Sequence, residues 1–268
     1  MKKLVLALTA AAAFAGPALA ADMAPRYSKA PPPPPVPVAS WTGCYIAGGG
    51  GYGLWNQENT TFDVTTVPRT QVTGMTTAGG RGYFGTVGAG CDYQFPVGSW
   101  QFVVGGFGDY DFASMKGNMD VPLLGAYGYE KLTSQWSAGG RIGVLVTPNL
   151  LTYFSAGYTE AHFGNVNLLN NFAALGPIGT PLPFFIGSRN YTGFFLGAGD
   201  EYALNFLPGL FWKTEYRFSD LDTKTNAIRV VATGLPGVFA DDSHKFVHTV
   251  RSELVYRFNW GGPVVAKY

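Results

Sequence analysis

The feature that most constrains this chain is a set of segments in which apolar and polar side chains alternate with a period of two. In residues 249–258, Leu254 and Phe258 fall on one face, and Arg251 and Glu253 fall on the other. This is the period of a β-strand. Charges confined to one face favour strands that face lipid outside and a polar lumen inside, because a lipid-facing charge costs about 2–4 kcal/mol. A soluble β-sandwich would also alternate, but with its aromatic residues inward and its charges outward.

An export signal favours the first arrangement. Two lysines precede an apolar stretch over residues 4–16, and a proline and small residues follow. This order predicts a signal peptide over residues 1–20, cleaved between Ala20 and Ala21. The apolar stretch is too short to span about 30 Å of hydrocarbon.

The composition agrees with a β-barrel in lipid. Aromatic residues make up 15% of the chain. Charged residues make up 13%, against roughly 25% in soluble domains. No segment after the signal offers 18 consecutive apolar residues, so the sequence predicts no transmembrane helix. Without residues 1–20, 16 basic residues stand against 17 acidic ones, and this balance argues against a nucleic-acid partner.

The alternating segments predict an all-β fold, namely an eight-stranded antiparallel transmembrane β-barrel over residues 41–260. An even strand number fits two termini on the periplasmic side. The expected strands are Trp41–Trp55, Arg81–Phe95, Trp100–Phe112, Leu132–Val146, Asn149–Phe163, Tyr191–Leu204, Trp212–Phe218 and Thr249–Phe258.

The connections between these strands alternate between long and short. This alternation is typical of barrels with long extracellular loops and short periplasmic turns. The expected loops cover residues 56–80, 113–131, 164–190 and about 222–243, and the expected turns lie at 96–99, 147–148 and 205–209.

Two flanking segments and the last strand carry further predictions. Residues 21–40 include five consecutive prolines, which favour an extended periplasmic spacer. Residues 261–268 are expected to form a C-terminal tail. Leu254, Tyr256 and Phe258 occupy alternate positions up to a final aromatic residue. Barrel-assembly machinery recognises such last strands in known outer-membrane proteins, so we expect an assembly signal here.

Four short motifs occur along the chain: Trp41-Thr42-Gly43-x-Tyr45-Ile46, Gly197-Ala198-Gly199-x-Glu201-Tyr202, Glu215-Tyr216-Arg217-Phe218 with Asp220-Leu221, and Val255-Tyr256-Arg257-Phe258-Asn259-Trp260. Together they resemble the small surface-antigen barrels of alpha-proteobacteria, which include the RopB-type outer-membrane proteins. The resemblance implies an eight-stranded, porin-like barrel at the cell surface, with roles in envelope integrity and host contact. Cys44, where an aromatic residue is usual, and Asp200, where an apolar one is expected, depart from the family pattern.

The glycine run over residues 48–53 formally satisfies the dinucleotide motif G-x-G-x-x-G. That motif needs a helix directly after it and an acidic residue about 20 positions further on. Nothing helical follows here. The glycines are better explained by strand curvature and close packing in a narrow barrel.

Cys44 and Cys91 fall near the periplasmic rim of neighbouring predicted strands. The oxidising periplasm permits a disulfide. Two adjacent reduced thiols are the alternative, because a cross-strand disulfide requires a narrow Cβ separation. Two cysteines alone do not make a metal site, and the sequence predicts no metal and no cofactor.

The three histidines, His162, His244 and His248, fall near the extracellular ends of predicted strands. A hydrolase site would need a serine and an acid held against one of them. Ser155 is separated from His162 by roughly 23 Å of strand. The sequence therefore predicts no catalytic residues and no enzyme, and a lipid-modifying barrel enzyme is the least favoured alternative.

Charges on the predicted lumen faces form the best candidate site. Counting from the periplasmic strand ends places Arg141 at the depth of Glu215 and Glu253. An eight-stranded interior is just wide enough for side chains to fill, so we expect opposite charges to plug it. A selective ion path is the functional alternative. The predicted cluster comprises Arg141, Glu201, Lys213, Glu215, Arg217, Arg251 and Glu253.

These observations predict a structural and surface-interaction protein of the bacterial outer membrane. The expected partners are outer-membrane lipid and lipopolysaccharide, the barrel-assembly machinery, and extracellular or host ligands at the loops. A narrow porin for small solutes or ions is the alternative.

Overall fold

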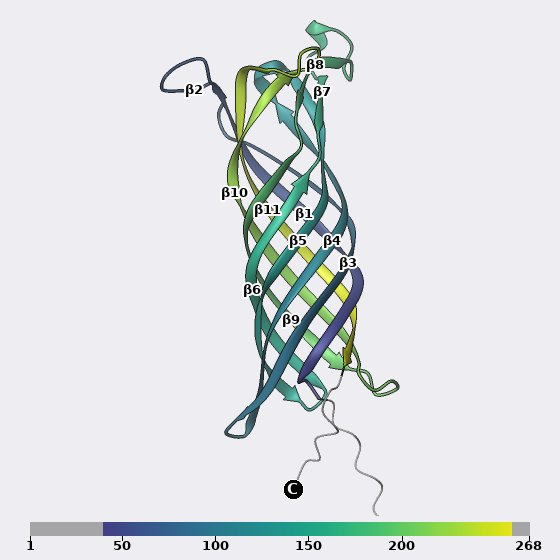
Figure 1. Ribbon diagram of the computed structural model, residues 1–268. Coiled ribbons are helices and arrows are strands. Elements are labelled where there is room, and N and C mark those ends of the chain that lie inside the picture. The colour runs from purple at the N-terminus through teal and green to yellow at the C-terminus, as the bar shows by residue number, and fades with distance from the viewer. Residues whose placement is uncertain (1–39, 259–268) are drawn as a thin grey trace, which may run out of the picture. The chain divides into compact units, whose positions relative to one another are not determined.

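The computed structural model describes residues 40–258 and shows a closed antiparallel β-barrel (Figure 1). Hydrogen bonds between β1 and β11 join the first and last strands, so the ring has no free edge. The predicted fold class is confirmed. The predicted signal peptide, its cleavage site, most of the proline-rich segment and the C-terminal tail lie outside the described residues. The ring consists of β1 (Gly43–Asp63), β3 (Thr76–Val97), β4 (Trp100–Val121), β5 (Ala126–Thr147), β6 (Leu150–Phe163), β9 (Arg189–Ala203), β10 (Leu210–Val230) and β11 (Pro236–Phe258).

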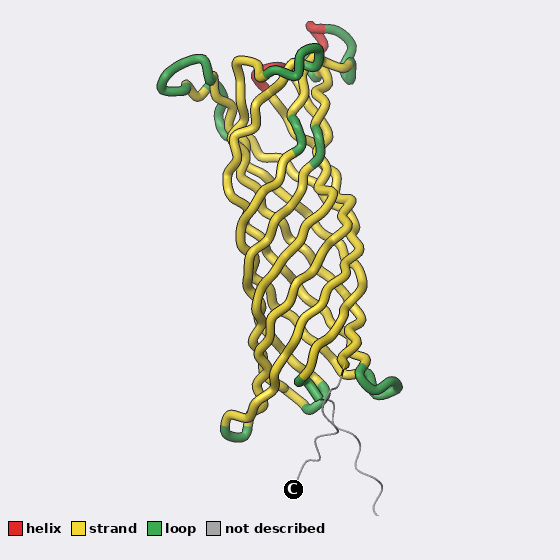
Figure 2. Tube along the Cα trace, viewed as in Figure 1, coloured by secondary structure: helices red, strands yellow, loops and turns green. Residues whose placement is uncertain are grey.

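Several strands are longer than the sequence patterns predict. A membrane-spanning strand needs about 9–11 residues, whereas β4 has 22 and β11 has 23. Two expected loops, 113–131 and 222–243, are therefore mostly strand, and only residues 122–125 and 231–235 connect the strands there. The additional length lies at the end of the barrel opposite the tight turns (Figure 2). Outer-membrane barrels have their short turns on the periplasmic side, so we assign this longer end as the extracellular one.

Short elements add to the extracellular end. The 164–190 connection contains β7 (Val166–Asn170), the 3₁₀ turn η2 (Ala173–Leu175) and β8 (Pro181–Ile186). The β7–β8 hairpin pairs with β5 and β10 and so continues the sheet. The remaining elements are β2 (Thr70–Gln71), which pairs with β1, and the 3₁₀ turn η1 (Pro122–Leu124).

The two faces of the strands differ in the way the alternation predicts. Tyr83 and Phe154 point outward and are 74% and 70% exposed, whereas Trp55 and Phe195 point inward and are buried. The core of the protein is therefore the lumen. No helix among residues 40–258 is long and apolar enough to cross a membrane.

Candidate functional site

Charged side chains occupy the lumen within and between two apolar layers. On β10, Phe211 belongs to the apolar layer near the tight turns, and Leu221 belongs to the layer on the extracellular side. Between them, Lys213, Glu215 and Arg217 point into the lumen and are buried. Each buried charge costs several kcal/mol of folding free energy unless an opposite charge or hydrogen bonds compensate it. The stability of the barrel therefore depends on how these groups are paired.

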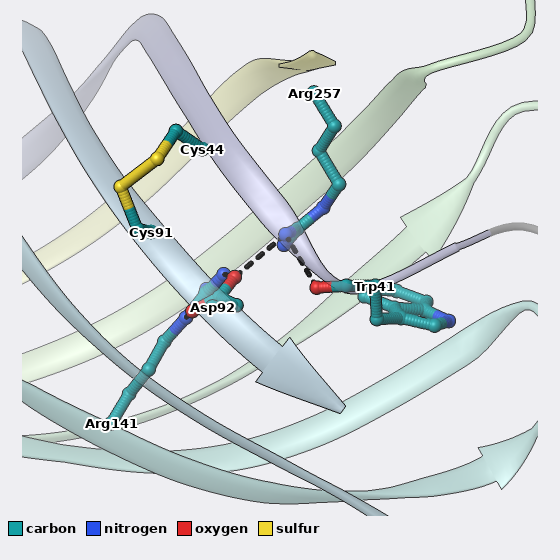
Figure 3. Close-up of a disulfide and its surroundings, with 6 residues drawn as sticks. All are labelled: Trp41, Cys44, Cys91, Asp92, Arg141 and Arg257. Carbon is teal, nitrogen blue, oxygen red and sulfur yellow. Dashed lines mark hydrogen bonds and ion pairs between the residues drawn. A yellow bond between two sulfur atoms is a disulfide. The ribbon is translucent and has the colours of Figure 1, made fainter. Parts of the chain in front are cut away.

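Four buried side chains near the tight-turn end form a ring of alternating charge. Arg141 contacts Glu201 at 2.8 Å and also binds Asp92 through two hydrogen bonds. Arg257 contacts both acids at 2.7 Å. Figure 3 shows Asp92 between the two arginines, with the backbone carbonyl of Trp41 accepting a further hydrogen bond from Arg257. Each carboxylate thus faces two guanidinium groups.

Aromatic rings complete the enclosure of this ring of charges. The Arg257 guanidinium lies 4.9 Å from the ring centroids of Tyr45 and Phe211, and 5.2 Å from that of Trp41. Such contacts stabilise a cation that has lost its water. The Trp41 ring packs on Phe211 at 4.8 Å, so aromatic side chains border the charges near the periplasmic end.

A second group of charges lies at mid-barrel. Arg217 forms the centre, because its guanidinium contacts Asp109 and Glu215 at 2.9 Å each. It also lies 4.3 Å from the ring centroid of Phe195. Two further ion pairs complete the group, Arg251 with Asp111 at 2.9 Å and Lys213 with Glu253 at 2.7 Å.

A further ion pair forms a third level of charges on the extracellular side. Lys245 contacts Glu130 at 2.9 Å, and its ammonium group lies 4.5 Å from the centroid of the Phe163 ring. Trp55 and Tyr191 surround the same ammonium group. The lumen is therefore filled at three successive levels by ion pairs packed against aromatic rings.

Glycines on the lumen face of β1 allow the backbone of β11 to lie close to this strand. Gly49 lies opposite Glu253, and Gly51 lies opposite Arg251. A Cβ atom on Gly49 would stand 2.1 Å from the carbonyl oxygen of Ser252. Small residues beside large ones are what a narrow barrel interior requires. The run over residues 48–53 lies within a continuous strand, with no helix after it.

All seven predicted lumen charges point inward and are buried, but their pairing differs from the prediction. Arg141 contacts Asp92 and Glu201, and makes no ion pair with Glu215 or Glu253. Counting residues from strand ends misplaces depth because barrel strands tilt and are staggered. The prediction omitted Asp92, Asp109, Asp111, Glu130, Lys245 and Arg257.

Three of these six omitted residues have a clear signal in the sequence. Asp109 and Asp111 lie on the polar face of the third predicted strand, and Arg257 lies on that of the eighth. Glu130 and Lys245 fall outside the predicted strands, so no alternating pattern predicted whether their side chains point inward or outward. Asp200 points outward and accepts a hydrogen bond from Thr152 near the tight-turn end.

Cys44 and Cys91 are direct cross-strand partners and are joined by a disulfide (Figure 3). Both lie on the outer face of the barrel, because the lumen-facing residues next to them are Tyr45 and Asp92. The bond fastens β1 to β3 near the tight-turn end. It closes a chain segment with a sequence separation of 47 residues.

The C44S/C91S variant should lower the free energy of unfolding by about 2–4 kcal/mol, because the disulfide restricts the unfolded chain. Urea titrations of the refolded protein in detergent, with and without reductant, measure this effect. Reductant should lower the wild-type midpoint and leave that of the variant unchanged. A wild-type midpoint that stays constant while both thiols become reduced would contradict the prediction.

The three histidines lie on the outer face of the barrel, away from the Ser155 side chain. His162 lies on the outer face and contacts Asn190, whereas Ser155 points into the lumen and donates a hydrogen bond to Glu215. His244 pairs with Asp220 on the outer face. Among residues 40–258, no group of three or more His, Cys, Asp or Glu side chains is placed to hold a metal ion.

Asp241 is an acidic group in the extracellular part of the barrel whose pKa is raised. Asp241 accepts a hydrogen bond of 2.6 Å from the Thr61 hydroxyl. Burial raises the pKa of the Asp241 carboxyl group, and the nearby Asp242 and Glu130 raise it further. The neutral form therefore favours folding, and that contribution is lost as the pH rises through the pKa of the folded state.

A closed antiparallel barrel with an apolar outer face and a packed, charged lumen defines an outer-membrane β-barrel protein. The chain is 32% identical over 262 residues to the 31 kDa outer-membrane immunogenic protein of Brucella melitensis. The match covers 96% of this chain and 100% of the relative, and the protein of the same name from Brucella suis matches equally. The chain belongs to this family of alpha-proteobacterial outer-membrane surface antigens, which confirms the predicted family and the outer-membrane location.

Solved structures of other bacterial outer-membrane proteins are more distant. OprG from Pseudomonas aeruginosa is 13% identical, with a TM-score of 0.47, and the alignment covers 82% of this chain and 99% of OprG. Ail from Yersinia pestis is 12% identical, with a TM-score of 0.32, over 78% of this chain and 99% of Ail. At this similarity the two structures carry no functional argument. No family model matches the chain.

Proposed function

We propose that this protein is a closed-lumen anchor of the outer membrane that presents an extended extracellular β-structure, with a role in envelope integrity and surface interaction. The observation that carries the proposal is the ion-pair network that fills the lumen. Arg141, Glu201 and Arg257 have side chains that are at most 2% exposed, and each is bonded to opposite charges on other strands. A lumen filled in this way holds strands together rather than conducting solutes.

The extracellular part supports the second half of the proposal. Strands β4, β5, β10 and β11 continue well beyond the length that a membrane requires, and the β7–β8 hairpin packs its apolar side chains against them. This makes a folded platform instead of loose loops. The name of the Brucella relatives calls them immunogenic, which supports exposure of the equivalent surface. Extracellular or host ligands would bind on this platform.

Surface labelling tests the presentation of this platform. Leu235, in the 231–235 connection, is 64% exposed, and Phe206, in a tight turn, is 78% exposed. In intact cells, a membrane-impermeant maleimide should label L235C and should label F206C only after the outer membrane is permeabilised. The native cysteines form a disulfide and leave the background low. Labelling of F206C but not of L235C in intact cells would overturn the proposed orientation.

A narrow ion path is the second candidate, and one observation favours it. Several buried polar atoms at mid-barrel make no hydrogen bond within residues 40–258, among them Nε of Arg251, Oδ1 of Asp111 and Oε1 of Glu253. Buried polar atoms require partners, so these would attract water or ions. They lie between the two apolar layers, which close the lumen on either side.

Assembly of the barrel remains a separate prediction. Leu254, Tyr256 and Phe258 all point outward from β11 and are 41–53% exposed. Assembly machinery that binds the last strand would contact this outward apolar stripe. We propose this stripe as the assembly signal.

A further inference from the structure

We propose that three basic side chains on the outer face, Arg81, Lys116 and Lys131, form a binding site for the phosphorylated headgroup of an outer-leaflet glycolipid. These residues are called the outer basic cluster below. The proposal concerns the outer face and therefore goes beyond the closed lumen and does not depend on it.

The sheet register places the three cations side by side. Arg81 on β3 is the direct cross-strand partner of Lys116 on β4, which is in turn the direct partner of Lys131 on β5. Directly opposite residues have Cβ atoms about 4.5–5.5 Å apart, and like charges in such pairs destabilise a sheet. Within residues 40–258, none of the three forms an ion pair with a carboxylate. Three adjacent cations therefore favour an anion from outside the chain.

Neighbouring aromatic residues fix the depth of the outer basic cluster. Tyr83 follows Arg81 by two residues toward the periplasm and packs edge-on against Tyr52, with ring centroids 4.9 Å apart. Phe112 lies four residues from Lys116 in the same direction and packs against Tyr110. Outward aromatic residues gather at the interface between lipid and water. The cluster thus lies at the level of the lipid headgroups, on the extracellular side of this belt.

The surface beside Arg81 and Lys116 is hollowed. An open hollow of about 550 Å³ lies next to Arg81 and Lys116, and its floor includes the backbone of Gly79, Gly80 and Gly117. Asn118 also lines the hollow. Its amide can bond hydroxyl groups, whereas the cations can bind phosphate. Phosphate beside sugar hydroxyls is the chemistry of a phosphorylated glycolipid such as lipopolysaccharide.

The location of the cluster selects the source of the phosphate. An acidic protein could bind only to a surface that projects beyond the lipid headgroups. This site instead lies directly above the aromatic belt. Basic clusters at the membrane surface bind anionic lipid headgroups in other membrane proteins. The outer basic cluster would then hold the barrel to the outer leaflet through charge.

A binding titration tests the proposal. The probe is fluorescently labelled bisphosphorylated lipid A, added to the refolded protein in detergent and followed by anisotropy. The R81Q/K116Q variant should bind the probe about 10- to 30-fold more weakly than wild type. The R69Q/R229Q variant removes the same charge from the extracellular surface and should bind within about twofold of wild type. Lipid A without phosphates should bind wild type and R81Q/K116Q equally.

Two outcomes would overturn the proposal. One is equal affinity of folded R81Q/K116Q and wild type for the bisphosphorylated probe. The other is displacement of the probe by inorganic phosphate when its concentration equals that of the phosphate groups on the probe. That result would assign the site to free phosphate. The R81K/K116R variant keeps the charge and should retain binding, so a loss of binding in R81Q/K116Q is separable from misfolding. Channel recordings test the closed lumen independently of both outcomes.

Discussion

The Glu201→Gln variant should lose about 3–5 kcal/mol of folding free energy, the cost of leaving a buried charge without its partner. The Glu201 carboxylate contacts Arg141 at 2.8 Å and Arg257 at 2.7 Å, and its side chain is fully buried. Glutamine preserves the volume but removes the charge, so Asp92 alone would face two guanidinium groups. Urea titration of the refolded barrel in detergent measures the loss.

The neighbouring residue provides the matched control. Asp200 points outward, and asparagine at that position can still accept the hydrogen bond from Thr152. We expect D200N to change stability by less than about 0.5 kcal/mol. Removing one cation as well, in E201Q/R257Q, should recover part of the loss. Equal stability of E201Q and D200N would show that the buried ring of charges does not hold the strands together.

The Gly49→Ala variant should fail to fold or should lose at least about 3 kcal/mol, the upper range for an overpacked core. The added Cβ would stand 2.1 Å from the Ser252 carbonyl oxygen and 2.7 Å from Cα of Glu253. Both atoms belong to the backbone of β11, so relief requires β1 and β11 to separate where they close the barrel.

Gly85 supplies the control for this clash. It faces outward on β3, and the nearest atom to an added Cβ is 3.9 Å away. G85A should therefore fold with a stability close to wild type. Electrophoretic mobility before and after heating distinguishes folded from unfolded barrels for both variants. A G49A barrel as stable as G85A would mean that the strands can separate without cost, against the tight packing described here.

The sequence predicts the two faces of the strands well because burial imposes a strict period of two. Arg217, Arg251 and Glu253 all lie in the lumen, where the alternation puts them. The alternation also continues beyond the membrane. Met119 and Val121 point inward there, but Asp120 between them is polar and faces water. These extensions lack the apolar outer face of a membrane-spanning strand, so their sequence resembles that of a loop. The predicted strands therefore end too early.

The pairing of the charges cannot be predicted from the strands taken separately. Arg141 and Asp92 lie 49 residues apart, on β5 and β3, which have β4 between them. Their contact depends on the tilt and stagger of the whole ring, and no short motif encodes these quantities. The outer basic cluster is similar, because Arg81, Lys116 and Lys131 become neighbours only when the register is known.

Single-channel recording tests the central claim of a closed lumen most directly. The refolded wild-type protein in planar bilayers should give no conductance steps, because ion pairs and aromatic rings fill the lumen at three levels. The R217A/R251A variant deletes two guanidinium groups at mid-barrel and should begin to conduct. Steady conductance steps in the wild type, with an ion selectivity altered in R217A/R251A, would contradict the closed lumen and make this protein a narrow porin.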